Sequence, residues 1–388
     1  MHSIWDQYRK EFPITKKMTY LANAAISPVP KTVYNKALEF YEDILNNGSL
    51  YWKSWMDTIE QTRRLYAEFI GASGPEEIAF THSTSEGTNI IAHMISNKGT
   101  VISNDLEYPS TNLPWINKNQ ENIKFVNSRD GKKIQIEDIS HIIENSTKGN
   151  VKTILTSHVQ FSTGFRQDLL NLGRLTNQRN IYFVVNSTQS LGALYLDVKE
   201  YNIDFMVSSG HKWMLSSFGI GGLYVNKDHL LDSNVSLPPF FSQSGQRVID
   251  RYDLNTKMDL SPTATRFEIG SPSIQNIFAL NAALKFISKI GIKKIESRIL
   301  QLTDYLISKA EGTEFEILSP IQNRNERSGI IIFRPRNKRD PSEIVAELEK
   351  KHNVIVSARG KGIRVSPHFY NNEEDIDMLI KAVKKICT

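Results

Sequence analysis

Short apolar runs alternate with longer amphipathic stretches over the first two thirds of the chain. Seven of these runs are rich in β-branched and aromatic residues, which predicts buried strands, and the amphipathic segments between several of them predict helices. The predicted strands are 77–81, 99–104, 123–127, 152–159, 181–186, 204–209 and 221–226, and the predicted helices include 56–70, 85–97 and 168–179. Strands that alternate with helices favour an α/β domain with a mostly parallel sheet.

The last third of the chain has a different order of elements. A long helix is predicted over 273–291, where a glycine ends it, and a second helix over 293–310. The remaining predictions are strands near 314–318, 329–334, 353–357 and 362–366 and helices over 341–351 and 372–386. We therefore expect a large α/β domain over 16–255 and a smaller α+β domain over 256–388, with residues 1–15 packing on either.

Composition narrows the class of protein. The 388 residues are 40% hydrophobic, enough for a large core and roughly two domains. The net charge of +5 comes from 47 basic and 42 acidic residues spread along the chain, so nucleic acid is not an expected partner.

No segment approaches the ~20 apolar residues of a membrane span, and the first residues lack a secretory apolar stretch. The single cysteine, Cys387, excludes an internal disulfide and a metal site built on cysteines, and a cytoplasmic location is expected.

The segment "SSGHKWML", residues 208–215, contains the most informative lysine of the chain. Lys212 follows two serines, a glycine and a histidine, and the glycine-rich stretch "GIGGLYV" comes after it. A lysine in this setting can form a Schiff base with an aldehyde cofactor, while nearby glycines let backbone approach a ligand and the serine and histidine can donate to a phosphate. Most lysines are solvated surface groups, so the interpretation depends on the residues at fixed distances from Lys212.

Three further segments place polar or aromatic groups at strand ends. Asn186 and Gln189 follow a predicted strand, at the edge where open parallel sheets bind ligands, although such residues are also ordinary turn formers. The hydroxyls of 83–85 precede a helical pattern, which suits either a phosphate or a plain N-cap. Tyr108 also follows a strand, where its ring can stack on a flat heterocycle or be partly buried as many tyrosines are.

In their order and spacing these segments resemble the class V aminotransferase and cysteine desulfurase family of pyridoxal-phosphate (PLP) enzymes, fold type I. The resemblance covers nearly the whole chain. It runs from "YLANAAISPVP" (20–30) through "FTHSTSEGTN", "LEYPSTNLPW", "SHVQFSTG", "VVNSTQS", "SGHKW" and "RFEIGSPS" to "IRVSPHFYNNEEDID" (363–377). It implies a mostly parallel central sheet with helices on both faces, a smaller C-terminal α+β domain, pyridoxal 5'-phosphate as cofactor, and a homodimer acting on a small α-amino acid.

The resemblance also implies a role for each matching residue. Lys212 corresponds to the Schiff-base lysine, and Arg364 to the arginine whose planar fork clamps the substrate α-carboxylate. Tyr108 takes the ring-stacking position, which is a histidine in many desulfurases. The other implied contacts are Thr84, Ser85, Ser209 and His211 to the phosphate, Ser271 to the phosphate across the dimer, Gln189 to the phenolic oxygen, and Asn23 and Ala25 lining the pocket.

Two departures from the family pattern bear on the reaction. Asn186 stands where the family normally has an aspartate that keeps the pyridine nitrogen protonated, and a neutral amide holds that proton less well. Three explanations are open. The reaction does not need a strong electron sink, as in some β-eliminations; or activity is lost or reduced; or the residue is a deliberate substitution. Desulfurases pass sulfur to a cysteine on a mobile loop, and the stretch 333–343, taken as its counterpart, has none.

Transamination is therefore the first expectation, as the broad default of the family. The alternatives are a β-eliminating lyase of the C–S lyase type and an epimerase of the isopenicillin N type. Tyr108 in place of histidine, together with the missing cysteine, argues against a persulfide-forming desulfurase. A weakly or non-catalytic PLP-binding protein is the alternative from another class, and Asn186 is the residue that supports it.

Overall fold

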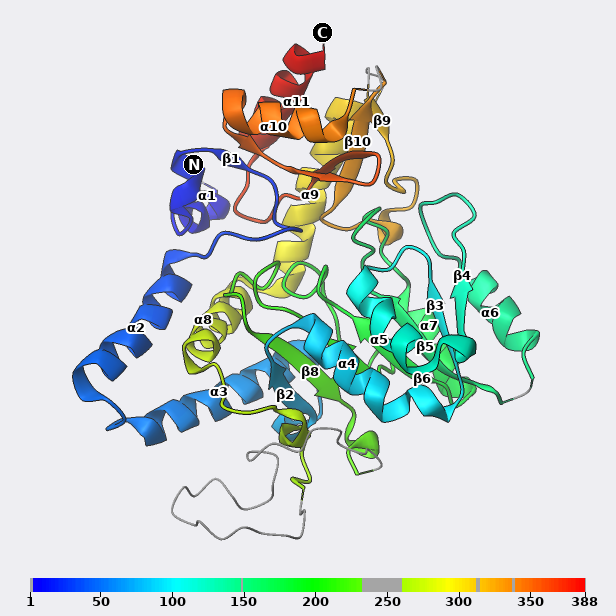
Figure 1. Ribbon diagram of the computed structural model, residues 1–388. Helices are drawn as coiled ribbons and strands as arrows, with labels where there is room; N and C mark the ends of the chain where they lie inside the picture. Colours follow the sequence, from blue (N-terminus) through cyan, green and yellow to red (C-terminus); the bar gives the residue numbers. More distant parts are fainter. Residues whose placement is uncertain (1–2, 148, 232–259, 312–314, 337–338, 388) are drawn as a thin grey trace.

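A seven-stranded sheet forms the centre of the larger body in the computed structural model, which describes residues 3–147, 149–231, 260–311, 315–336 and 339–387 (Figure 1). The strand order is β2-β8-β7-β6-β5-β3-β4. The strands are β2 (Ile78–Thr81), β3 (Thr100–Asn104), β4 (Ile123–Val126), β5 (Val151–Ser157), β6 (Tyr182–Asn186), β7 (Phe205–Val207) and β8 (Gly221–Val225). Only β8 is antiparallel to its neighbours, because the connection from β7 carries no crossover helix. The predicted mostly parallel sheet is confirmed.

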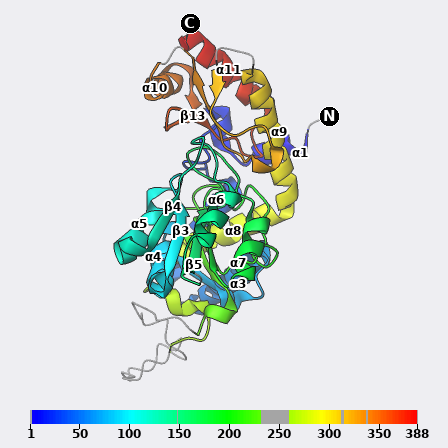
Figure 2. The same cartoon turned by 90° about the vertical axis from the view of Figure 1, so that its right-hand side faces the viewer.

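Helices cover both faces of this sheet, as predicted (Figure 2). Alternate residues of β6 show the two faces: Val184 packs in a cluster with residues of one helical layer, while Phe183 and Val185 pack with residues of the other. The first layer consists of α4 (Thr84–Ile95) and α5 (Pro109–Asn119), and the second includes α3 (Trp52–Ile70), α6 (Ile136–Glu144), α7 (Leu169–Gln178) and α8 (Ile274–Ile290). A further helix, α2 (Lys31–Asn47), packs along α8.

The smaller body is a four-stranded antiparallel sheet with three helices. The sheet has the order β12-β13-β10-β9, and one of its faces packs on the helices. Its elements are α9 (Ile292–Ala310), β9 (Phe315–Ile317), β10 (Ile331–Pro335), α10 (Pro341–His352), β12 (Ser357–Arg359), β13 (Gly362–Val365) and α11 (Glu373–Cys387). Ile332, on the opposite face, joins the core of the larger body, so that face points toward the central sheet. The predicted domain boundary at 255/256 lies outside the described residues and stays a prediction.

The N-terminal segment runs along both bodies. Helix α1 (Ile4–Arg9) places Arg9 in a double hydrogen bond with Asp375, at 2.7 and 2.9 Å. The ring of Tyr8 contacts Phe286 of α8 and Phe369 near the C-terminus. Strand β1 (Thr19–Tyr20) then pairs in parallel with β11 (Val354–Ile355). Among the described residues no helix combines the length and apolar character needed to cross a bilayer.

Candidate active site

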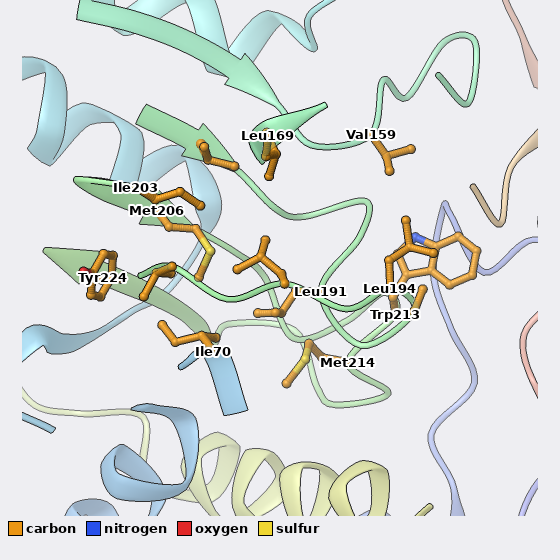
Figure 3. Packing of buried hydrophobic residues seen from close by; sticks show 14 of the residues in the cluster. Ile70, Val159, Leu169, Leu191, Leu194, Ile203, Met206, Trp213, Met214 and Tyr224 are labelled. Carbon is orange, nitrogen blue, oxygen red and sulfur yellow. The ribbon is translucent and has the colours of Figure 1, made fainter. Parts of the chain in front are cut away.

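The connection from β7 to β8 carries Lys212 on a tightly anchored turn. Leu215 donates its backbone N–H to the Lys212 carbonyl at 2.9 Å and has a φ of +56°, which is uncommon for a leucine. The side chains of Trp213, Met214 and Leu215 are buried in the main core. Figure 3 shows Trp213 and Met214 among the side chains of this cluster. Packing of these neighbours fixes the backbone from which the lysine side chain extends.

Segments from both ends of the chain hold the backbone on either side of Lys212. The backbone N–H of Ser27 donates to the His211 carbonyl at 3.0 Å. The Nε2 of His368 lies 3.1 Å from the Trp213 carbonyl, while its Nδ1 accepts from the N–H of Phe369, so Nε2 carries the proton and donates. Burial lowers the pKa of His368 to about 4, so the ring stays neutral at pH 7. The sequence reading missed this contact because nothing in the sequence links residue 368 to the lysine segment.

The amine of Lys212 lies in an environment that disfavours its charge. Burial lowers the pKa of Lys212 to about 8, and the positive charges of Arg364 and Arg359 add to the effect. Its Nζ lies 6.0 Å from the centroid of the Tyr108 ring. At pH 7 roughly one molecule in ten then has a neutral amine, the form that acts as nucleophile or base.

Hydroxyls gather at the N-terminus of α4 and at the lysine segment. Ser83 caps the helix by accepting from the N–H of Glu86, and Thr84 and Ser85 form its first turn. The hydroxyl of Thr84 lies 2.7 Å from that of Thr188, which ties the helix to the loop after β6. Among the described residues, nothing hydrogen-bonds the buried Oγ of Ser209, which is costly unless a ligand oxygen satisfies it. These groups and the free helical amides suit a phosphate.

His211 precedes the lysine and packs against an exposed aromatic ring. Its imidazole stacks on Phe218, with the ring centroids 4.3 Å apart. Burial, followed by the charge of Lys212, lowers the pKa of His211 to about 4. At pH 7 this side chain is therefore a neutral donor or acceptor and adds no charge to the site.

The amides of Asn186 and Gln189 are held by specific partners. The Oδ1 of Asn186 accepts from the N–H of Thr188 at 3.0 Å, and its Nδ2 donates to the hydroxyl of Thr111 at 2.9 Å. Gln189 donates through Nε2 to the Ala24 carbonyl at 3.0 Å, and its Oε1 accepts from the indole of Trp213 at 3.0 Å. Thr111 and Thr188 were not singled out in the sequence, because threonines near strand ends are ordinary turn residues.

Among the described residues, no hydrogen bond or ring contact joins three residues assigned by resemblance to Lys212, and their roles stay predictions. Asn23 is fully buried and uses its amide to bond Ser366, Ser27 and Tyr370, which ties the N-terminal loop to the small body. Ala25 is half-buried in the same loop. Ser271 is exposed, and no contact among the described residues joins it to Lys212.

Arg364 reaches the site from the small sheet. It is only 1% exposed, and it donates through Nε to the Ser357 hydroxyl at 3.1 Å and through Nη1 to the Phe161 carbonyl at 3.3 Å. The Phe161 ring in turn lies edge-on to Tyr108 with centroids 5.1 Å apart. Burial, together with the charge of Arg359, lowers the pKa of Arg364 to about 9. The structure thus brings Lys212, Tyr108 and Arg364 together.

Glu107 is a buried carboxylate beside Tyr108 that the sequence did not single out. It accepts from the backbone N–H of Ser157 at 2.6 Å, from Gln160 at 2.7 Å and from Asn104 at 3.0 Å. These bonds fasten the loop after β3 to the end of β5, and so fix where the Tyr108 ring stands.

The profile of the class-V aminotransferases matches residues 19–379. The chain belongs to the class-V aminotransferase family. It is 28% identical over 403 residues to a probable cysteine desulfurase from Pyrococcus abyssi, covering 98% of this chain and 97% of the relative.

Two of the solved structures that share the fold of this family member are a cysteine desulfurase and a cystine C-S lyase. The apo structure of a cysteine desulfurase from Thermococcus onnurineus NA1 has a TM-score of 0.87 and 24% identity, and covers 100% of this chain and 99% of its own. The complex of the cystine C-S lyase C-DES with its product cysteine persulfide has a TM-score of 0.82 and 20% identity, covering 96% and 98%.

Membership of the family implies pyridoxal 5'-phosphate as the cofactor, as the sequence predicted. The residues present fit that group. The buried Ser209 hydroxyl, which no described residue bonds, and the start of α4 suit its phosphate, and the buried amine of Lys212 suits its aldehyde. Bound there, the cofactor supplies an electron sink for a substrate carbon.

The lowered pKa of Lys212 predicts how cofactor capture depends on pH. Only the neutral amine attacks an aldehyde, so for the cofactor-free protein we expect the capture rate constant to rise about tenfold per pH unit below pH 8 and to level off above it. Stopped-flow absorbance measures the rate. N-acetyl-lysine amide, as the control amine, should keep accelerating toward pH 10.5, the ordinary lysine value. A protein rate that follows the control to that pH would contradict the lowered pKa.

Proposed function

We propose that this class-V aminotransferase family member is a PLP-dependent enzyme that transaminates an α-amino acid. The observation that carries the proposal is a buried amine of lowered pKa, Lys212, held between an aromatic ring and a buried arginine. This combination provides a nucleophile, a flat stacking surface and a carboxylate partner in one place.

Each residue has a distinct part in the proposed reaction. Arg364 binds the substrate α-carboxylate and thereby decides which bond at the α-carbon is presented for cleavage. Lys212, once displaced by the substrate amine, takes the proton from the α-carbon and returns it at the neighbouring carbon. Tyr108 supplies the stacking ring, and Glu107 holds it through the loop. Thr84, Ser85, Ser209 and His211 hold the phosphate, and Asn186 and Gln189 face the ring.

A persulfide-forming desulfurase is not the function we propose, although the Pyrococcus relative bears that name. The only cysteine, Cys387, ends α11 and packs on the core of the small body. That position lies on the helical side of the small sheet, whereas Arg364 lies on the side that points toward Lys212. A thiol on the helical side of the small sheet is poorly placed to take sulfur from a substrate bound next to Lys212.

Asn186 favours β-elimination as the second candidate reaction. Elimination begins with the same proton removal by Lys212, but a leaving group on the β-carbon then takes up the electron pair, so the ring nitrogen needs less positive charge. The remaining alternatives, an epimerase and a weakly catalytic PLP-binding protein, would use the same lysine and the same phosphate-binding groups.

A homodimer and a cytoplasmic location complete the proposal. Helix α2 exposes a row of large apolar side chains, which is typical of a surface that another chain covers. These exposed residues are Tyr34, Leu38, Tyr41, Ile44 and Leu45, followed by Leu50 and Tyr51. In a dimer we expect Ser271 to contact the phosphate of the other protomer.

Product analysis after incubation with a panel of amino acids tests the proposed reaction. Borohydride reduction followed by peptide mapping is expected to leave a pyridoxyl group on Lys212. Exchange between an amino acid and a keto acid supports transamination, whereas release of ammonia together with pyruvate supports elimination. If the panel leaves the cofactor absorbance unchanged while Lys212 is labelled, the protein binds the cofactor without this chemistry. An unlabelled Lys212 contradicts every version of the proposal.

A further inference from the structure

A second arginine lies on the same face of the small sheet as Arg364. In the hairpin of β12 and β13, Ser357 pairs with Arg364 and Arg359 pairs with Gly362. Side chains two residues apart on a strand share a face, as do cross-strand partners, so Arg359 and Arg364 project from the same face. Ile332, the partner of Arg364 on β10, belongs to the core of the larger body, so this face points toward Lys212.

No carboxylate neutralises either arginine in the part of the chain that the structure describes. Arg359 donates through Nη1 to the neighbouring Ala358 carbonyl, and Arg364 bonds only a serine hydroxyl and a carbonyl. The contrast is Arg334 on β10, which lies on the same face as Ile332 and is paired with Glu316 of β9 at 2.8 Å. The sheet therefore neutralises a neighbouring arginine on this face and leaves the two near the lysine without an anion.

The site accordingly has two guanidinium groups that no carboxylate of the described residues pairs with. Arg364 is buried at its base, and Arg359 is exposed at its rim. Arg359 acts on both deeper cations, since its charge contributes to the lowered pKa values of Lys212 and Arg364. The α-carboxylate of a substrate would balance Arg364 alone. The exposed guanidinium of Arg359 is then left available for a second negative group on the substrate.

We propose that Arg359 binds an anionic group on the substrate side chain, so that the site selects α-amino acids with an acidic side chain, a carboxylate or a sulfinate. The inference rests on the proposed function, because it assigns the α-carboxylate to Arg364. The planar guanidinium of Arg359 can form two parallel hydrogen bonds to either anion, and its place at the rim suits the far end of a side chain.

Pairs of amino acids that differ only in side-chain charge test this selectivity. We would titrate the PLP-loaded full chain with aspartate against asparagine and with glutamate against glutamine, and follow the cofactor absorbance. The acidic member of at least one pair is expected to bind about tenfold or more tightly, the range of a hydrogen bond to a charged group. Cysteine sulfinate against cysteine then separates sulfinate from carboxylate recognition.

Three variants assign the preference to Arg359. Arg359→Gln is expected to remove the preference by weakening the acidic ligands only, and Arg359→Lys to keep part of it because the charge remains. Arg334→Gln, which removes a charge that Glu316 already balances, should leave it unchanged.

The outcomes separate this inference from the proposed function. Equal binding of acidic and neutral partners, or equal weakening of both by Arg359→Gln, overturns the role of Arg359 while the proposed function stands. A parent protein whose absorbance responds to no amino acid overturns both.

Discussion

Replacing Lys212 by methionine is expected to abolish turnover and the borohydride-stable cofactor adduct while making the cofactor-free protein more stable. Methionine keeps the length of the side chain but provides neither nucleophile nor base, and the loss of such a group costs at least about 10³-fold in rate. Peptide mapping and single-turnover kinetics measure both losses. Lys199→Met, which removes an exposed lysine, should retain the adduct and full turnover.

The gain in stability follows from the direction in which folding shifts the pKa of Lys212. Its pKa is about 8 in the folded chain and ordinarily 10.5, so folding disfavours the charged amine and the cost is complete below pH 8. Between pH 8 and 10.5 the folded amine is neutral while the unfolded chain still holds its proton, so the cost falls with each pH unit and has disappeared above 10.5. We therefore expect Lys212→Met to raise the free energy of unfolding by roughly 2 kcal/mol at pH 7, with the gain shrinking toward pH 10.5. Urea denaturation at both pH values measures it, and a variant that is less stable at pH 7 would contradict the buried charge.

Replacing Asn186 by aspartate is expected to raise transaminase turnover by about tenfold or more. A carboxylate at this position favours protonation of the pyridine nitrogen, and an opposite charge nearby shifts such a pKa by one to three units. Both hydrogen bonds of residue 186 can form with an aspartate. One carboxylate oxygen still accepts from the N–H of Thr188, and the other accepts from the hydroxyl of Thr111, which then donates instead of accepting.

Steady-state turnover and the cofactor absorbance spectrum measure this effect. Asn186→Ala serves as the control, because it removes the hydrogen bonds without adding charge and is expected to lower activity. Unchanged rate and spectrum in Asn186→Asp would show that the ring nitrogen does not limit the reaction. A rise in keto-acid exchange at the expense of ammonia release would instead tie Asn186 to the choice between transamination and elimination.

Local patterns predicted the sheet and the position of Lys212, because strands buried on both faces are continuous apolar runs. Contacts between segments that are far apart in the sequence could not be predicted from such local patterns. His368 supports the carbonyl of Trp213 from a segment 155 residues away, and no spacing rule connects them. Arg359 is different, since alternation along Ser357–Arg359 and the return strand to Arg364 would have placed both arginines on one face once the hairpin was recognised.

Glu107 shows why a candidate site read from the sequence is incomplete. An acid followed by Tyr108 indicates nothing by itself, and its importance emerges only when β3 and β5 bring Ser157 and Gln160 to the same carboxylate. The resemblance assigned Asn23 to the pocket, and that role stays a prediction; its hydrogen bonds to Ser366, Ser27 and Tyr370 could not be predicted from the sequence.

The two carbonyls beside Lys212 receive their donors from opposite ends of the polypeptide, Ser27 and His368. These donors come from segments far apart in the chain, one before the central sheet and one after the small sheet. The geometry of the turn that carries the lysine therefore depends on the two bodies being packed together, and not on the central sheet alone.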